Sequence, residues 1–467
     1  MRFLTRDKTF YTALVTLAIP VVLQNLVAFA VNFTDNLMVS SLGDGAVSGV
    51  YVGNQLHMLI QIFANGLGGV VLVLAAQYWG RGDVRSIRRI TAIGVQLAVL
   101  LGLAAGLACR AFPAGIVGLL APGDEVVASG AAYLSIVCLS YPFFCLSQAL
   151  IAALRSVESP HVGLWVSLLG FLVNVSLNWL LIFGHGGFPA LGVRGAAMAT
   201  LIARVTECAV LLVYLFRFDG KLGLRPAALF VTDRTLFGDF VRCGIPMICG
   251  QIVWGLNTMS NTAILGRYPA SVITAASLTN TMNTLAYIIM MGMASAVGII
   301  TGKTVGAGKT ELMKEYARTT QLLFLTLGVM TGLGVWLLRD PFIALYGGIT
   351  PEAAACARQL IGVLSVTVVG SCYEVACLDG LVKAGGDVSF VFKNNTFFVL
   401  CVVLPSAIVA ASLHMPAWIV FACLKCDQIL KCFVAVVKIN RFNWMKNLTR
   451  DMPDAPDTPE HGGVPPR

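Results

Sequence analysis

The chain has 467 residues, of which 57% are hydrophobic and 12% are charged, and its mean hydropathy is +0.81. A soluble domain carries about 25% charged residues, so this composition excludes a soluble globular protein. The formal net charge of +9 does not predict nucleic-acid binding, because in a membrane protein such charge sets the topology. We therefore expect an all-α integral membrane protein.

The predicted elements are transmembrane helices, each formed by about 20 mostly apolar residues. The first apolar run begins near Phe10 and is longer than a signal-peptide core, so it is interpreted as a retained helix. An even number of spans places both termini on the same side. The twelve predicted spans are 10–38, 46–75, 90–109, 127–153, 161–183, 193–216, 243–265, 271–300, 318–338, 355–381, 389–411 and 416–437.

The distribution of Lys and Arg predicts the orientation. Most of them lie at the N-terminus, in the even-numbered loops and at the C-terminus, while the odd-numbered loops contain Arg110, Arg194, Arg267, Arg339 and Arg358. Because positive residues favour the cytoplasmic side, both termini are expected in the cytoplasm of a multi-pass protein of the plasma (inner) membrane.

The two halves of the chain repeat each other in the same direction. At an offset of 226 residues, Ile19-Pro20 recurs as Ile245-Pro246, and three further matches are Asn54 with Asn280, Gly80 with Gly306 and Gly82 with Gly308. Parallel repeats are typical of transporters whose substrate site lies between two bundles that rock against each other.

The repeat predicts two parallel six-helix lobes. The N-lobe is assigned to residues 1–216 and the C-lobe to 243–448, with a cytoplasmic inter-lobe loop at 217–242. The tail at 449–467 is rich in Pro and acidic residues and is expected to be disordered and dispensable for transport.

Residues 302–310 read GKTVGAGKT and superficially resemble a nucleotide-binding P-loop. The spacing of that loop requires a glycine where this chain has Lys303, and no short buried strand precedes it. We therefore expect a cytoplasmic turn after the eighth span, equivalent to the turn after the second span, and no nucleotide.

Polar residues within the spans are candidates for ion coupling, because an ionisable group in the membrane costs at least ~2.5–3.5 kcal/mol. Asp35 lies near the end of the first span, with Asn174 and Asn178 one turn apart in the fifth and Thr200 in the sixth. A buried carboxylate can exchange a proton near neutral pH or supply an oxygen ligand to Na⁺. The alternatives are an Asp35 at the wet helix end and asparagines that only join helices.

The second half differs at these positions, since the counterpart of Asp35 is Asn261. Asp379 and Asp427 are expected to form salt bridges with Lys383 and Lys425. The pair Cys423 and Cys426 is interpreted as small apolar helix residues rather than a metal or redox site, because a second ligand pair is missing. Four residues are assigned to a substrate cavity, where an acid attracts cations and methionines adapt to varied ligands: Glu374, Met290, Met291 and Asn280.

These features together resemble the multidrug and toxic compound extrusion (MATE) transporters over nearly the whole chain to about residue 448. The resemblance rests on Ile19-Pro20 with Asp35 fifteen residues after the proline, NVSLNWLLIFGHGGFPALGVRGAAMAT, LRSVESP and RFNWMKN. It implies export of cationic amphiphiles in exchange for H⁺ or Na⁺. It also implies that Asp35 couples the ion, with Asn174, Asn178 and Thr200 as partners, and that Pro20 bends the first helix.

One departure from the family concerns the second half. Related bacterial members carry an acidic residue in the seventh span, where this chain has Trp254-Gly255-Leu256, and another in the tenth, near Cys372. A second ion site in the C-lobe therefore stays open, as does the choice between H⁺ and Na⁺.

The sequence favours a secondary antiporter rather than an enzyme. We expect it to act as a monomer in the bilayer on small amphiphilic drugs or metabolites, without a cofactor. If Na⁺ is the coupling ion, its ligands are Asp35, Asn174 and Asn178. The alternative is a flippase for lipid-linked precursors, for which several cations should line the cavity; only Arg204 and Lys425 qualify.

Overall fold

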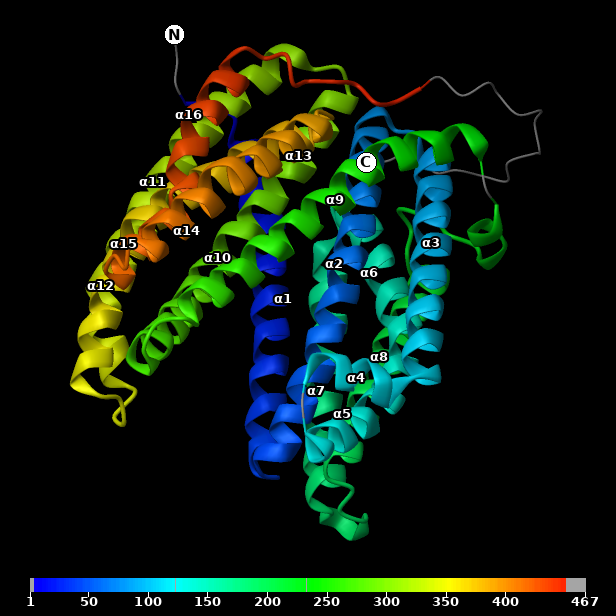
Figure 1. Ribbon diagram of the computed structural model, residues 1–467. Helices are drawn as coiled ribbons and strands as arrows, with labels where there is room; N and C mark the ends of the chain where they lie inside the picture. The colour runs from blue at the N-terminus through cyan, green and yellow to red at the C-terminus, as the bar shows by residue number, and fades with distance from the viewer. Residues whose placement is uncertain (1–3, 122, 232, 451–467) are drawn as a thin grey trace.

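The computed structural model describes residues 4–121, 123–231 and 233–450, and every regular element in these ranges is a helix (Figure 1). The first half contains α1 (Lys8–Ser40), α2 (Asp44–Arg81), α3 (Val84–Ala111), α4 (Pro113–Leu120), α5 (Asp124–Val137), η1 (Cys138–Ser140), α6 (Tyr141–Ser156), α7 (Pro160–Phe183), η2 (His185–Gly187) and α8 (Val193–Arg217). The second half contains η3 (Pro226–Phe230), α9 (Arg234–Leu265), α10 (Ala270–Gly306), α11 (Thr310–Ala344), α12 (Pro351–Glu374), η4 (Val375–Lys383), α13 (Val388–Phe397), η5 (Phe398–Val403), α14 (Leu404–Ser412), α15 (Ala417–Lys425) and α16 (Asp427–Asn440).

The helices confirm an all-α integral membrane protein. Within the described residues, eleven helical segments are long and apolar enough to cross a membrane. The twelfth predicted span is divided by a break at Cys426 into α15 and α16, so neither piece reaches that length alone. One boundary was wrong: the residues assigned to a loop at 217–242 include the start of α9 at Arg234.

Two hydrophobic cores organise the helices, and α1 and α9 contribute to both. The first turns of α1 pack into the core of the second half through Phe10 and Leu14, whereas Val39 belongs to the core of the first half. The reverse holds for α9, whose Phe240 lies in the first core and whose Leu265 lies in the second. Each helix therefore passes from one core to the other.

The crossing helices carry the two prolines that the sequence repeat relates. Pro20 lies inside α1 and Pro246 lies inside α9, and both helices continue through them. A proline within a helix removes one backbone hydrogen bond and weakens the helix at that point. Both helices are thus locally weakened near the place where they change cores.

The two predicted turns are real and share one backbone geometry. Gly82 after α2 has φ 82° and its counterpart Gly308 after α10 has φ 70°, the left-handed region that favours glycine. Most of GKTVGAGKT belongs to the end of α10, which runs to Gly306, and the preceding residues are helical. A P-loop opens between a strand and a helix, so this context does not match one.

The lobes meet tightly at the end where α2 and α10 finish, here called the closed end. A Cβ added to Gly80 would overlap the carbonyl oxygen of Lys303, and one added to Gly306 would overlap that of Gln77. Lys303 Nζ also lies 2.8 Å from Glu158 Oε1 across the lobes. The helices spread apart toward the opposite end, at the bottom of Figure 1.

The segment after α16 crosses the closed end from one lobe to the other. It starts at Trp444, whose side chain is fully buried, and Lys446 Nζ lies 2.8 Å from Asp387 Oδ1. Leu448 N then donates to Gln77 Oε1 of α2 at 2.8 Å. Of the predicted disordered tail, residues 451–467 lie outside the described part of the chain.

Candidate functional site

The structure brings together three of the residues predicted for ion coupling. Asn178 of α7 donates through Nδ2 to Asp35 Oδ1 of α1 at 2.5 Å, and the same nitrogen donates to Asn174 Oδ1 at 3.2 Å. Both asparagines are almost completely buried, with 2% and 1% exposed. The Asp35 carboxylate of α1 and the two amides of α7, which lie four residues apart on one face of that helix, therefore form a connected polar cluster within the first lobe.

One acceptor atom in this cluster can still receive a hydrogen bond. Within the described part of the chain, Asn178 Oδ1 is buried without a hydrogen-bond partner. An unsatisfied buried acceptor costs about 1–3 kcal/mol, and a donor or ion that binds there would remove this cost. The cluster therefore has room for one additional donor or cation.

Thr200 and Pro20 form no hydrogen bond with Asp35 in the described residues. Thr200 lies on α8, and its hydroxyl donates to Ala196 O of its own helix at 3.0 Å. Pro20 lies 15 residues before Asp35 on α1. The neighbouring Asn32 is exposed and bonds to Ala28 O within α1, so it does not join the cluster.

Two residues that the sequence did not assign to ion coupling interact with Asp35: Tyr133, and Arg204, which was considered only as a cation for the flippase alternative. Tyr133, which interacts electrostatically with Asp35, donates its hydroxyl to Asn54 Oδ1 at 3.2 Å. Arg204 also interacts with Asp35 and forms a 2.8 Å ion pair with Glu207. Tyr133 gives no signal in the sequence because a tyrosine in a span is common, whereas the in-span charge of Arg204 marked it as a candidate without showing that it interacts with Asp35.

The second lobe holds a different cluster, made of charges that neutralise one another. Lys431 Nζ of α16 lies 2.8 Å from Asp427 Oδ2 and 3.3 Å from Glu374 Oε1, and the side chain of Lys431 is 6% exposed. Glu374 ends α12 where the helix widens into η4, and Asp427 begins α16 just after the break at Cys426. Two irregular helix positions thus place the acids around one lysine.

Of the two salt bridges predicted for this lobe, one is confirmed and the other was wrong. Asp379 lies 3.2 Å from Lys383, as expected. Asp427 pairs with Lys431 rather than Lys425, because one turn of α16 brings Asp427 and Lys431 onto the same face. The Lys425 ammonium instead lies 6.0 Å from the centre of the Phe421 ring.

The residues assigned to the substrate cavity do not share one environment. Met290 is 1% exposed and packs in the core of the second lobe, so in this conformation it does not line an accessible cavity. Met291 is half-buried and Asn280 is exposed. Glu374 faces Lys431, as described above.

The described residues contain no group of three or more His, Cys, Asp or Glu side chains placed to hold a metal ion. The thirteen cysteines are free, among them Cys423 and Cys426.

Two parallel helical bundles, joined by crossing helices and carrying buried charge within their spans, define the class of polytopic membrane transporters. The model of the MatE family matches residues 20–180 and 246–409, one match in each half. The chain therefore belongs to the MatE family, the multidrug and toxic compound extrusion transporters.

Relatives and solved structures agree with this assignment. The chain is 31% identical over 329 residues to a probable multidrug resistance protein NorM of Rhizobium meliloti (strain 1021), covering 69% of this chain and 68% of that protein. A NorM homologue of Geobacillus kaustophilus (strain HTA426) is 26% identical, with 81% and 83% covered. A crystal structure of a Vibrio cholerae MATE transporter superposes with a TM-score of 0.85 at 14% identity, covering 93% and 97% of the chains, and so shares the fold.

Proposed function

We propose that the chain is a secondary active antiporter that exports amphiphilic, mostly cationic drugs or metabolites in exchange for H⁺ or Na⁺. The observation that carries this proposal is the Asp35 carboxylate bound to the buried Asn178 amide. A lone carboxylate at this position can change its charge by binding one ion, and α1 links that change to both lobes.

The geometry favours H⁺ over Na⁺. Asn178 presents its amide nitrogen to Asp35, whereas a hard cation needs several oxygens facing it. Protonation of Asp35 removes the negative charge that the amide stabilises and supplies a hydroxyl that can donate. Asn178 Oδ1 is a buried acceptor without a partner in the described residues, so a rotated amide can receive that proton.

Rocking of the lobes is the proposed route from ion exchange to transport. The closed end must open once in each cycle, which breaks the contact between Lys303 and Glu158 and separates Gly80 from Gly306. Pro20 and Pro246 are the positions where α1 and α9 can bend with the smallest loss of helical hydrogen bonds. The closed end is assigned to the cytoplasmic side of the plasma (inner) membrane, because the basic loops lie at this end.

The proposed substrates follow from the family and the charges. The two relatives described above are named as probable multidrug resistance proteins NorM, and the carboxylates Asp35 and Glu374 lie in the spans. The flippase alternative requires cations that can bind a pyrophosphate. Arg204 pairs with Glu207 and Lys431 pairs with Glu374 and Asp427, and Lys425, beside the Phe421 ring, supplies a single cation, which argues against it. We propose that the protein acts as a monomer. We propose no enzymatic activity for it.

The test uses the purified protein in proteoliposomes loaded with a cationic dye. With a pH gradient and equal Na⁺ on both sides, the wild type is expected to move the dye, and Asp35→Asn is expected to fall to the level of empty vesicles. Asp124→Asn, an exposed acid at the start of α5, serves as the matched control and should keep wild-type transport.

Two results contradict the proposal. Asp35→Asn vesicles that transport the dye at the wild-type rate would show that the carboxylate does not couple the ion. Transport that requires ATP after both ion gradients are dissipated would exclude an antiporter. A rate that follows a Na⁺ gradient but not a pH gradient would replace H⁺ by Na⁺.

A further inference from the structure

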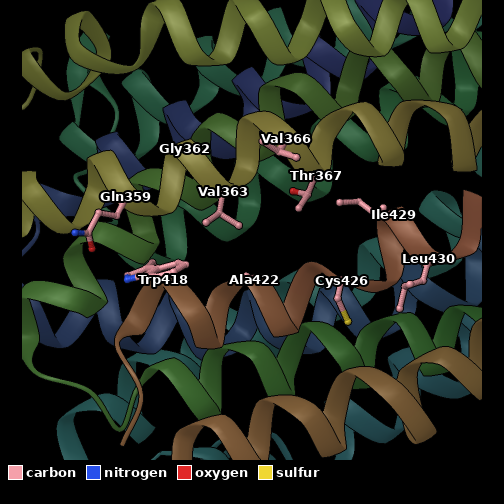
Figure 2. Close-up of a pocket in the computed structure, with 10 residues that line it drawn as sticks. All are labelled: Gln359, Gly362, Val363, Val366, Thr367, Trp418, Ala422, Cys426, Ile429 and Leu430. Carbon is pink, nitrogen blue, oxygen red and sulfur yellow. The ribbon is translucent and has the colours of Figure 1, made fainter.

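The outer face of the second lobe contains a long apolar groove. Its first part, of about 830 Å³, lies between α12 and the α15–α16 pair, and Figure 2 shows Val363, Thr367 and Cys426 bordering this space. A second part of the same volume continues between α11, α12 and α16 and shares Val366 and Ile429 with the first. Val366 is 60% exposed, so the groove opens away from the core.

The groove has the length of a lipid chain. On α12 it runs from Gln359 to Tyr373, fourteen residues or about 21 Å at the helical rise. One leaflet of the hydrocarbon core is about 15 Å thick, half of the usual 30 Å. The groove is therefore longer than one leaflet is thick, and at the closed end it reaches Arg318, the first residue of the predicted span 318–338.

The end of the groove nearest the closed end is basic and aromatic. Arg318 and Lys314 of α11 lie over the ring of Phe442, at 5.6 and 5.7 Å from its centre. Phe442 has φ 55°, a left-handed backbone that is uncommon for a bulky residue and costs about 1–3 kcal/mol. Arg318, Phe442 and the amide side chains of Gln321 and Asn440 line the groove at this end.

The repeat shows what covers the equivalent face in the first lobe. The counterparts of Lys314 and Leu322 at the offset of 226 are Arg88 and Gln96 of α3. Arg88 Nε donates to Leu222 O and Gln96 Nε2 donates to Leu229 O, both in the connection between the lobes.

That connection also inserts side chains into the first core, where Leu222 is fully buried and Leu224 is 3% exposed. The second lobe has no equivalent cover in the described residues, because the segment after α16 leads away to α2. Leu322 is accordingly 41% exposed and Leu325 is 46% exposed.

We propose that this groove binds one anionic phospholipid, which covers the second lobe as the inter-lobe connection covers the first. The acyl chain lies along α12 past Val366, and the phosphate is held by Arg318, which lines the groove, and by Lys314, for which it competes with the exposed carboxylate of Glu311, 2.7 Å from Lys314 Nζ. A basic pair at the membrane surface attracts anionic headgroups by about 1 kcal/mol for each cation, so a zwitterionic lipid binds more weakly.

The experiment measures the lipid that the full-length protein retains. Protein in detergent is equilibrated with equal amounts of phosphatidylglycerol and phosphatidylcholine, separated by size exclusion, and analysed by mass spectrometry. The wild type is expected to retain phosphatidylglycerol preferentially. Lys314→Gln with Arg318→Gln should reduce that preference by about fivefold for each cation.

Two further variants separate the headgroup from the groove. Arg339→Gln, at the opposite end of α11, is the matched control and should leave the preference unchanged. Val366→Trp fills the shared part of the groove and should reduce retention of both lipids.

The proposal fails if the wild type retains the two lipids equally, or if the double variant retains its preference. It also fails if Val366→Trp leaves lipid retention unchanged but alters the oligomeric state, because the groove would then bind a second copy of the chain. None of these results depends on transport activity.

Discussion

Each lobe contains an acidic side chain buried within its helices, but the partners of that acid differ between the lobes. In the first lobe Asp35 is bound by a neutral amide of Asn178, so its negative charge is not neutralised by that contact. In the second lobe Glu374 and Asp427 enclose Lys431, which carries a fixed positive charge. An acid bound by an amide can still take up a cation, whereas an acid bound by a lysine already has one.

This difference agrees with the proposal of an exchangeable ion in the first lobe, whereas the charges of the second lobe form a neutralised cluster. The two are not related by the repeat, since the counterpart of Asp35 is Asn261. The comparison therefore predicts that changes to the second cluster act mainly on stability and changes to the first mainly on transport.

The largest expected effect is that of Lys431→Met. Removing the lysine leaves two acids, Glu374 and Asp427, buried without their cation, and breaking a buried pair costs about 3–5 kcal/mol. The measurement is the Tm of the purified variant in detergent, with a large decrease expected.

A triple variant separates lost charge balance from lost packing. Lys431→Met combined with Glu374→Gln and Asp427→Asn removes all three charges, and such replacements are often close to neutral. We expect it to recover most of the Tm. If Lys431→Met has a wild-type Tm, or if the triple variant is no better than the single one, the cluster is not held by charge balance.

A smaller effect is expected from Asn178→Leu. The change removes the donor to Asp35, and a hydrogen bond to a charged group contributes about 1.5–3 kcal/mol. Transport should fall much more than Tm, because an uncompensated Asp35 changes its ion affinity. Asn174→Leu is the control, since Asn174 reaches Asp35 only through Asn178. Equal losses of transport in the two variants would contradict the direct role of Asn178.

The helical architecture could be predicted from the sequence because it depends on short stretches of residues. Apolar length determined the spans, and the repeat related Gly82 to Gly308, which adopt the same left-handed backbone. The contact of Asp35 with Asn178 was predicted as a candidate because ionisable and amide side chains are rare within spans. These signals depend on residue type and spacing alone.

The remaining features depend on packing between distant segments. The partner of Asp427 follows from the break at Cys426, which sets the face of α16, and a continuous apolar run does not reveal such a break. The burial of Met290 depends on which face of α10 meets the second core. The path of the chain from Trp444 to Gln77 joins residues that are far apart in the sequence.

The smallest effect concerns the same acid–lysine pairing at the membrane edge. Asp387 is bound by Lys438 at 2.8 Å and by Lys446 at 2.8 Å, and Lys446 has a side chain that is 52% exposed. Burial acts to raise the pKa of Asp387, but the hydrogen bonds from the two lysines outweigh it and lower that pKa below its usual value. Because Lys446 is half exposed and Lys438 still pairs with Asp387, Lys446→Ala should cost only about 0.2–1 kcal/mol.

The pH dependence follows from the sign of that shift. A carboxylate with a lowered pKa in the folded state contributes stability that is complete above its unfolded pKa of about 4 and is lost as the pH falls through the lower folded value. The difference in Tm between Lys446→Ala and wild type should thus be constant from pH 5 to pH 8 and shrink only below about pH 4. A difference that disappears between pH 7 and pH 5 would show that Asp387 titrates near neutral pH and that its pKa is raised rather than lowered in the folded protein.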